Sequence, residues 1–190
     1  VMNDILGGGG FTARMVKKIR SDEGLAYSVG SYFTPGQYYT GTFTALFQPK
    51  VPTVAYGVRL ALAEMDRIKR EPVTEEELKV TKGSIIDGFP DTFGTKAIVA
   101  QVFLGMELTG TPDDYYQTLR DRINAVTIAD VQRVAQKYLA SEKAAILVVG
   151  GKAEELEAGD KEHPGKLSEV AKLPVIKLPL RDPLTMKPIK

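Results

Sequence analysis

The chain reads NDILGGGGFTAR over residues 3–14 and KIRSDEGLAYSV over residues 18–29, and these stretches carry its most distinctive pattern. Ile5 and Leu6 are spaced as at the end of a helix. Four glycines follow them: Gly7, Gly8, Gly9 and Gly10. Because glycine loses the most backbone entropy on folding, we predict that the helix stops here and that the four glycines form a flexible loop. Helical spacing resumes over residues 11–20.

This second helix has an apolar residue at every fourth position. Phe11, Met15 and Ile19 are predicted to share one helical face. Thr12 is a candidate cap at its start. The opening of the chain is therefore expected to be a helix, a glycine break and a second helix.

The pattern then changes from helix to strand. Residues 25–33 and 38–47 alternate as strands do, and Pro35-Gly36 between them indicates a turn, so an antiparallel hairpin is predicted. A long amphipathic helix follows and stops before Pro72. Its apolar stripe consists of Val51, Val54, Ala55, Val58, Ala61, Leu62, Met65 and Ile68.

Several shorter helices are expected next. Thr74 and Glu77 have the spacing of a capping box, as do Thr127 and Asp130. A helix between them is predicted to start at Asp91 or Thr92 and to end at Gly110-Thr111-Pro112, and another is predicted over residues 115–123. The predicted core-facing residues of the helices after Pro90 are Ile98, Val102, Phe103, Met106, Val131, Val134, Ala135, Tyr138 and Leu139.

The order of elements predicts the fold class. After the helices, residues 144–149 are predicted to form a buried strand, and residues 168–171 a short helix. A hairpin, consecutive helices and a returning strand indicate an α+β fold with helices packed on one face of an antiparallel sheet. The strands are too few for a complete sheet, and the first helix lacks a cap, so we expect an N-terminally incomplete domain over residues 1–151. Residues 152–190 are interpreted as its tail.

Composition narrows the function classes. The 190 residues include 25 basic and 24 acidic side chains, a net charge of +1, and no basic block, so nucleic acid is not expected as a partner. The sequence has no run of about 18 apolar residues, so no membrane span is predicted, and no export signal is visible. The absence of cysteine excludes disulfides and thiol nucleophiles. Localisation, cytoplasmic or bacterial periplasmic, and self-association into a homo-oligomer stay open.

Catalytic chemistry is sparse in this sequence. The single histidine, His163, lies in a polar segment and is expected to be a solvated loop residue, so the chain alone cannot build a helix-borne zinc site. No serine sits in a Gly-x-Ser-x-Gly turn. The acidic residues 75–77 lie in a first helical turn, where carboxylates favourably meet the helix dipole. No metal ligand is therefore assigned.

The glycine run after Ile-Leu, Arg14 after Phe11, and Ile-Arg-x-x-x-Gly-Leu-Ala-Tyr-Ser together resemble the M16 family of zinc metallopeptidases, which includes pitrilysin, insulysin and the mitochondrial processing peptidase. The later order of elements is similar to that family through about Gly151. The resemblance is to the C-terminal half, with a LuxS/metallopeptidase-like fold. It implies that zinc sits on a His-x-x-Glu-His motif in another domain or subunit, so this chain should be inactive alone.

The resemblance also implies roles for two residues. Arg20 and Tyr27 match the family's substrate-binding pair, which gives hydrogen bonds to a bound peptide near the zinc. An arginine can donate several fixed hydrogen bonds, and a tyrosine hydroxyl can donate to an oxygen that gains charge. The structural alternatives are an arginine at its helix end and a tyrosine packed in a strand. A non-proteolytic structural or peptide-binding subunit is the alternative function.

Overall fold

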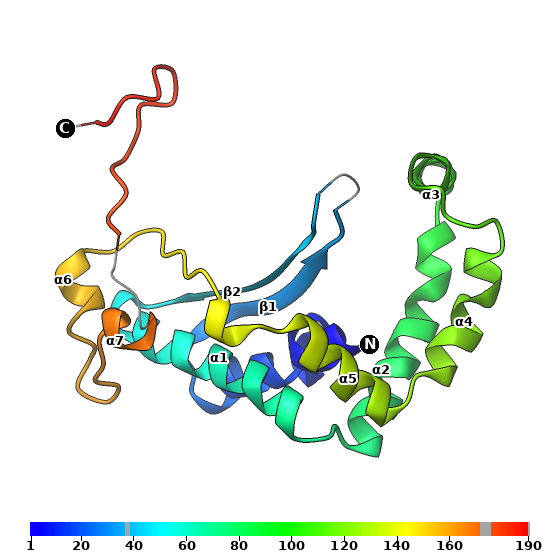
Figure 1. Ribbon diagram of the computed structural model, residues 1–190, viewed down its shortest axis with the longest axis horizontal. Coiled ribbons are helices and arrows are strands. Elements are labelled where there is room, and N and C mark those ends of the chain that lie inside the picture. Colours follow the sequence, from blue (N-terminus) through cyan, green and yellow to red (C-terminus); the bar gives the residue numbers. More distant parts are fainter. Residues whose placement is uncertain (37–38, 172–175, 190) are drawn as a thin grey trace.

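The computed structural model describes residues 1–36, 39–171 and 176–189. A two-stranded hairpin lies along one side of the molecule, and helices α1 and α5 lie beneath it in the view of Figure 1, while α2, α3 and α4 extend away to one end. The element order and this packing confirm the predicted α+β class with helices on one face of an antiparallel sheet.

The hairpin consists of β1 (Ala26–Thr34) and β2 (Thr42–Pro49), which pair antiparallel as predicted. β2 begins at Thr42, later than the prediction, and residues 37 and 38 lie outside the described part of the chain. Phe33 is opposite Phe43, and their ring centroids are 5.0 Å apart. Such cross-strand aromatic pairs hold the register of a hairpin.

The register contains one irregularity, near the start of β1. Ala26 is opposite Pro49, whereas Val29 is opposite Phe47, so three steps along β1 match two along β2. One extra residue on one strand is a β-bulge, which redirects the side chains beside it.

The core lies between the hairpin and the helices. Helix α1 (Val54–Arg70) follows the short 3₁₀ turn η4 (Val51–Thr53) and ends before Pro72, as predicted. Its stripe packs against β2, the N-terminal helices and α5. The buried residues of the stripe are Val54, Ala55, Val58, Ala61, Met65 and Ile68.

The N-terminal helices differ from the prediction. The π-helix η1 (Asp4–Gly8) continues through Gly7 and Gly8, so the predicted break at Gly7 is wrong. The 3₁₀ turn η2 (Gly10–Thr12) carries Phe11, whose side chain is 68% exposed rather than buried. Helical structure resumes at Arg14 and continues as the π-helix η3 (Val16–Asp22), so Phe11 is not on the face of Met15 and Ile19.

Thr12 is likewise not the predicted cap. Its hydroxyl donates a hydrogen bond to the Gly9 carbonyl oxygen at 3.1 Å, within the turn before the helix. The helix therefore starts without a side-chain cap at this position.

Both predicted capping boxes are present. Thr74 caps α2 (Glu75–Gly88) together with Glu77, and Thr127 caps α5 (Ile128–Tyr138) together with Asp130. Val131, Ala135 and Leu139 are buried as predicted. Tyr138 is exposed instead, because it lies at the end of α5 with its ring edge-on to Phe33.

Helix α3 (Lys96–Thr109) corrects another prediction. Asp91 and Thr92 lie in the 3₁₀ helix η5 (Phe89–Phe93), and the helix begins only after its cap, Thr95. None of its residues is buried, and Phe103 is 60% exposed, because η5 is the main element packed against α3. Gly110 ends α3 with a φ of +64°, as predicted, and α4 (Tyr115–Ala125) follows.

Residues 144–149 do not form the predicted buried strand. They follow the 3₁₀ turn η6 (Ser141–Lys143) as an extended segment, and Val149 is 90% exposed. Ile146 and Val148 do contact the small apolar cluster around Val54 and Val58. A strand requires a neighbouring backbone, and the described residues contain only β1 and β2 as paired strands.

The C-terminal region contains two short helices. They are α6 (Ala153–Leu156) and α7 (Leu167–Ala171), and the second confirms the short helix predicted over residues 168–171. Leu167 is buried in the cluster with Val54, Ala55 and Val58, so α7 rests on α1.

Candidate functional site

The turn between η3 and β1 places Arg20 and Tyr27 near one another. Ile19 and Leu25, on either side of this turn, are buried in the core, and the Leu25 N–H donates to the Ile19 carbonyl oxygen at 2.9 Å. Gly24 has a φ of +62°, which side-chain-bearing residues rarely adopt. The chain therefore reverses between two buried residues. Arg20 comes directly after Ile19, and Tyr27 lies two residues after Leu25.

The β-bulge positions Tyr27. Tyr27 and its neighbour Ser28 lie between the regular pairs formed by Ala26 and Val29, and both are exposed. In a regular strand one of two successive side chains would face the core. The bulge therefore keeps the Tyr27 ring on the outside of the protein, where it is 82% exposed.

The Arg20 guanidinium lies against this ring. Its carbon Cζ is 4.3 Å from the Tyr27 ring centroid and 4.5 Å from the Phe11 ring centroid. Both distances are within the range of cation–π contacts. The structure thus brings together the two residues predicted from the resemblance and adds Phe11 to them.

Sequence reasoning missed Phe11 because its spacing to Met15 and Ile19 fits a continuous helix. The actual chain turns at Gly10, whose φ is +66°, and this turn moves Phe11 off the buried face. The fourth glycine, directly before Phe11, was the available signal for such a turn.

The charges around Arg20 leave its donors free. Lys18 Nζ pairs with Glu23 Oε1 at 2.8 Å, and this hydrogen bond lowers the pKa of the Glu23 carboxyl and raises that of Lys18. Arg20 has no ion pair or hydrogen bond with another side chain in the part of the chain that the structure describes. Its N–H groups therefore remain available to a ligand.

The glycines lie beside this site and pack closely. Gly7 is buried against β1, where Asn3 and Ser31 exchange two hydrogen bonds of 3.0 and 2.8 Å. A Cβ atom at Gly7 would lie 2.9 Å from the Ser31 Cβ and 3.0 Å from its backbone nitrogen. Close approach of backbone to β1 is therefore one reason for glycine here.

We expect Gly7→Ala to lower the free energy of unfolding by about 1–3 kcal/mol, as overpacking of a tight interior does. Gly83→Ala, in α2, is the matched control, because a Cβ atom there meets nothing within 4 Å. That control should be neutral or stabilising by up to about 1 kcal/mol. Urea unfolding of both variants checks the prediction, and equal stability of the two would contradict the close packing at Gly7.

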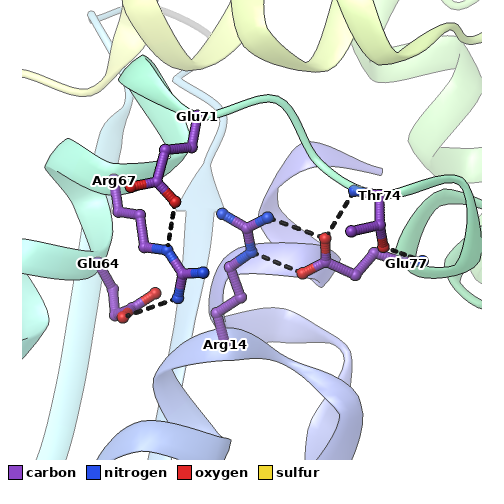
Figure 2. A network of polar contacts seen from close by, with 6 residues as sticks. All are labelled: Arg14, Glu64, Arg67, Glu71, Thr74 and Glu77. Carbon is purple, nitrogen blue, oxygen red and sulfur yellow. Dashed lines mark hydrogen bonds and ion pairs between the residues drawn. The ribbon is translucent and has the colours of Figure 1, made fainter.

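A second polar cluster connects the N-terminal helices to α2 (Figure 2). Arg14, 8% exposed, donates to Glu77 through Nε at 2.6 Å and Nη2 at 2.8 Å. The Glu77 carboxylate also accepts from the Thr74 N–H at 2.8 Å. Arg14 is the main cause that lowers the Glu77 pKa to about 2. Sequence reasoning found only the capping role of Glu77, because nothing local indicates a partner 63 residues away.

Arg67 forms the neighbouring part of this cluster. It pairs with Glu71 at 2.8 Å and with Glu64 at 3.6 Å, both on or just after α1. Figure 2 shows the two arginines side by side, each bound to its own carboxylates. The Arg14–Glu77 pair therefore holds the start of α2 close to the start of the helix that bears Arg20, whereas the Arg67 contacts join residues on or just after α1.

Comparison with known proteins finds a similar family and similar solved structures. The family described as peptidase M16 inactive domain matches residues 1–85, which include Arg14, Arg20, Tyr27 and Glu77. Residues 1–85 are thus similar to the M16 peptidase family. The resemblance found in the sequence is thereby confirmed, and the matched family is described as an inactive domain.

Solved structures extend the comparison beyond residue 85. A peptidase M16 inactive domain from Pseudomonas fluorescens is 25% identical, with a TM-score of 0.66, over 73% of this chain and 33% of that chain. A conserved protein from Enterococcus faecalis V583 is 24% identical, with a TM-score of 0.62, over 72% and 31%. A protease from Helicobacter pylori is 19% identical, with a TM-score of 0.60, over 74% and 33%.

These matches confirm the M16 fold for about three quarters of the chain. The chain spans about a third of the length of these solved structures. Comparison with curated proteins finds no match.

The resemblance to the M16 family implies a zinc ion, and the described residues do not fit one. In the described parts of the chain, no three side chains of histidine, aspartate or glutamate come together as metal ligands. His163 is stacked on Tyr56, with ring centroids 4.4 Å apart, and its Nδ1 is 3.3 Å from Asp160. It is largely buried rather than solvated as predicted, because the C-terminal segment folds against Tyr56 on α1.

None of the described helices has both the length and the apolar composition that a membrane crossing requires.

Proposed function

We propose that this chain is the substrate-positioning half of an M16 zinc metallopeptidase that hydrolyses peptides, with the zinc held by a separate domain or subunit. One observation supports this proposal most strongly. The Arg20 guanidinium lies against the Tyr27 ring while its N–H groups have no partner among the described side chains. A half-buried cation without a charged partner is suited to bind a ligand rather than to stabilise the fold.

Arg20 and Tyr27 would have different tasks in such a site. The planar guanidinium carries five N–H donors in a fixed arrangement, which suits the carbonyl oxygens of an extended peptide. The Tyr27 hydroxyl would donate to the carbonyl oxygen of the scissile bond, which gains negative charge when the bond is attacked. Neither task needs a metal ligand from this chain.

The proposal assigns residues 1–151 to this domain and residues 152–190 to its tail. Its partners are the zinc-bearing M16 domain or subunit and a peptide substrate. Because backbone groups are common to all peptides, contacts with carbonyl oxygens favour unfolded peptides with little sequence preference.

Arg20→Ala tests this function in the assembled peptidase, this chain together with its zinc-bearing partner. We expect kcat/KM for a fluorogenic peptide to fall about 10- to 100-fold, as expected when hydrogen bonds from a charged donor are lost. Bound zinc, measured in each preparation, should not change.

Lys17→Ala is the matched control, because Lys17 is an exposed cation on the same helix and does not make the cation–π contacts that Arg20 makes. Its kcat/KM should stay within about twofold of the wild type, as expected for a screened surface charge. Full activity of the Arg20→Ala enzyme would overturn the positioning role and favour the alternative, a non-proteolytic structural or peptide-binding subunit.

A further inference from the structure

Phe11 is a large apolar residue at this site that does not pack into the core. Its side chain is 68% exposed, although its neighbour Ala13 is completely buried. The 3₁₀ turn η2 presents the ring to the Arg20 guanidinium, with Arg20 Cζ 4.5 Å from the ring centroid. An exposed phenylalanine gains little from burial, so its contact with Arg20 is its main interaction.

The guanidinium therefore contacts two aromatic rings, Phe11 from η2 and Tyr27 from β1. A guanidinium accepts aromatic rings on its faces and donates hydrogen bonds from its edge. Rings on the faces consequently leave the N–H groups accessible. The contacts also restrict a side chain that otherwise carries about 2 kcal/mol of rotamer entropy.

The turn that carries Phe11 is itself anchored. Gly10 adopts a positive φ, the Thr12 hydroxyl bonds the Gly9 carbonyl oxygen at 3.1 Å, and the Ala13 N–H bonds the Gly10 carbonyl oxygen at 3.0 Å. Buried Ala13 and Arg14 then attach the turn to the core. The Phe11 ring is thus held by the backbone and not by packing of its own side chain.

We infer that Phe11 is a positioning residue: its ring orients the Arg20 guanidinium so that the N–H edge is ready to bind peptide carbonyl oxygens. This inference rests on the proposed function, because it assigns Phe11 to the same site. Phe11 itself touches no reacting atom and acts through Arg20. A prearranged donor loses less conformational entropy when the ligand binds, and this difference favours binding.

A double-mutant cycle in the assembled peptidase tests whether Phe11 acts through Arg20. Phe11→Leu keeps an apolar side chain and removes the ring, and we expect kcat/KM to fall about two- to fivefold, the value of one exposed cation–π contact. Phe11→Trp keeps a ring and should restore the wild-type value. In an Arg20→Ala background, Phe11→Leu should cause no further loss.

The outcomes distinguish this inference from the proposed function. If Arg20→Ala lowers kcat/KM but Phe11→Leu does not, Phe11 has no positioning role and the proposed function stands. Equal losses from Phe11→Leu in both backgrounds would mean that Phe11 acts independently of Arg20, which also overturns the inference. If Arg20→Ala has no effect, both fail together.

A stability measurement on the same variants excludes a purely structural effect. Because the Phe11 side chain is exposed, Phe11→Leu should leave the melting temperature within about 2 °C of the wild type. A large drop in melting temperature that Phe11→Trp fails to restore would instead indicate a structural role and contradict the inference.

Discussion

Tyr27→Phe is expected to lower kcat of the assembled peptidase by about 100-fold, the usual cost of removing one donor to an oxygen that develops charge. The structure makes this substitution selective. The phenyl ring stays at the bulge and keeps its contact with Arg20, whose Cζ lies 4.3 Å from the ring centroid. Only the hydroxyl is lost, so KM and bound zinc should stay close to the wild-type values.

Tyr32→Phe provides the matched control for this prediction. Tyr32 lies on the same strand and is also exposed, but it is in the regular part of the hairpin, opposite Thr44. Its kcat should match the wild type. Steady-state kinetics on both variants with equal zinc content is the measurement. If both variants keep full kcat, the Tyr27 hydroxyl does not take part in hydrolysis.

Glu77→Gln has the largest expected effect on stability. It breaks the ion pair with the mostly buried Arg14, and removing one partner of such a pair leaves an uncompensated charge. We expect the free energy of unfolding to fall by about 3 kcal/mol. Glutamine can still serve in the capping box with Thr74, so the substitution isolates the charge from the cap.

The pH dependence should change in the same variant. The Glu77 pKa is about 2 in the folded protein, against 4.5 for an unperturbed glutamate, with the Arg14 hydrogen bond as the main cause. Because the folded pKa is depressed, this stabilisation is complete above about pH 4.5 and is lost as the pH falls towards 2. Glu77→Gln should lack this part of the acid destabilisation.

Glu76→Gln is the control, because Glu76 is exposed on the same first turn of α2. Its unfolding free energy should lie within about 0.5 kcal/mol of the wild type. Arg14→Leu combined with Glu77→Gln should recover part of the loss, since no charge is then left unpaired. Equal urea midpoints for Glu77→Gln and Glu76→Gln would contradict the importance of the pair.

The elements predicted correctly from the sequence are those whose cause is local. The capping boxes at Thr74 and Thr127 involve residues three positions apart, and the α1 stripe depends only on helical periodicity. Residues 144–149 have the composition of a strand, but a strand also needs a partner backbone beside it. The apolar pattern of α3 likewise shows that one face is apolar without showing what covers it.

In the candidate site, too, the local features could be predicted from the sequence and the tertiary contacts could not. Arg20 and Tyr27 came from a motif contained within 27 residues, whereas the positions of their side chains depend on the turn at Gly24 and on the bulge. A bulge is a mismatch between two strands and has no counterpart in the sequence of either. The contact of Phe11 with Arg20 and that of Arg14 with Glu77 are tertiary in the same sense.

The Arg14 to Glu77 contact has a mechanical consequence. Arg14 begins the helix that bears Arg20, and Glu77 lies in the first turn of α2, from which η5, α3 and α4 extend (Figure 1). A tilt of the α2–α4 region would therefore pull on the helix that bears Arg20, through the two short hydrogen bonds between Arg14 and Glu77. The position of the α2–α4 region is therefore coupled to that of the Arg20 helix through a single ion pair.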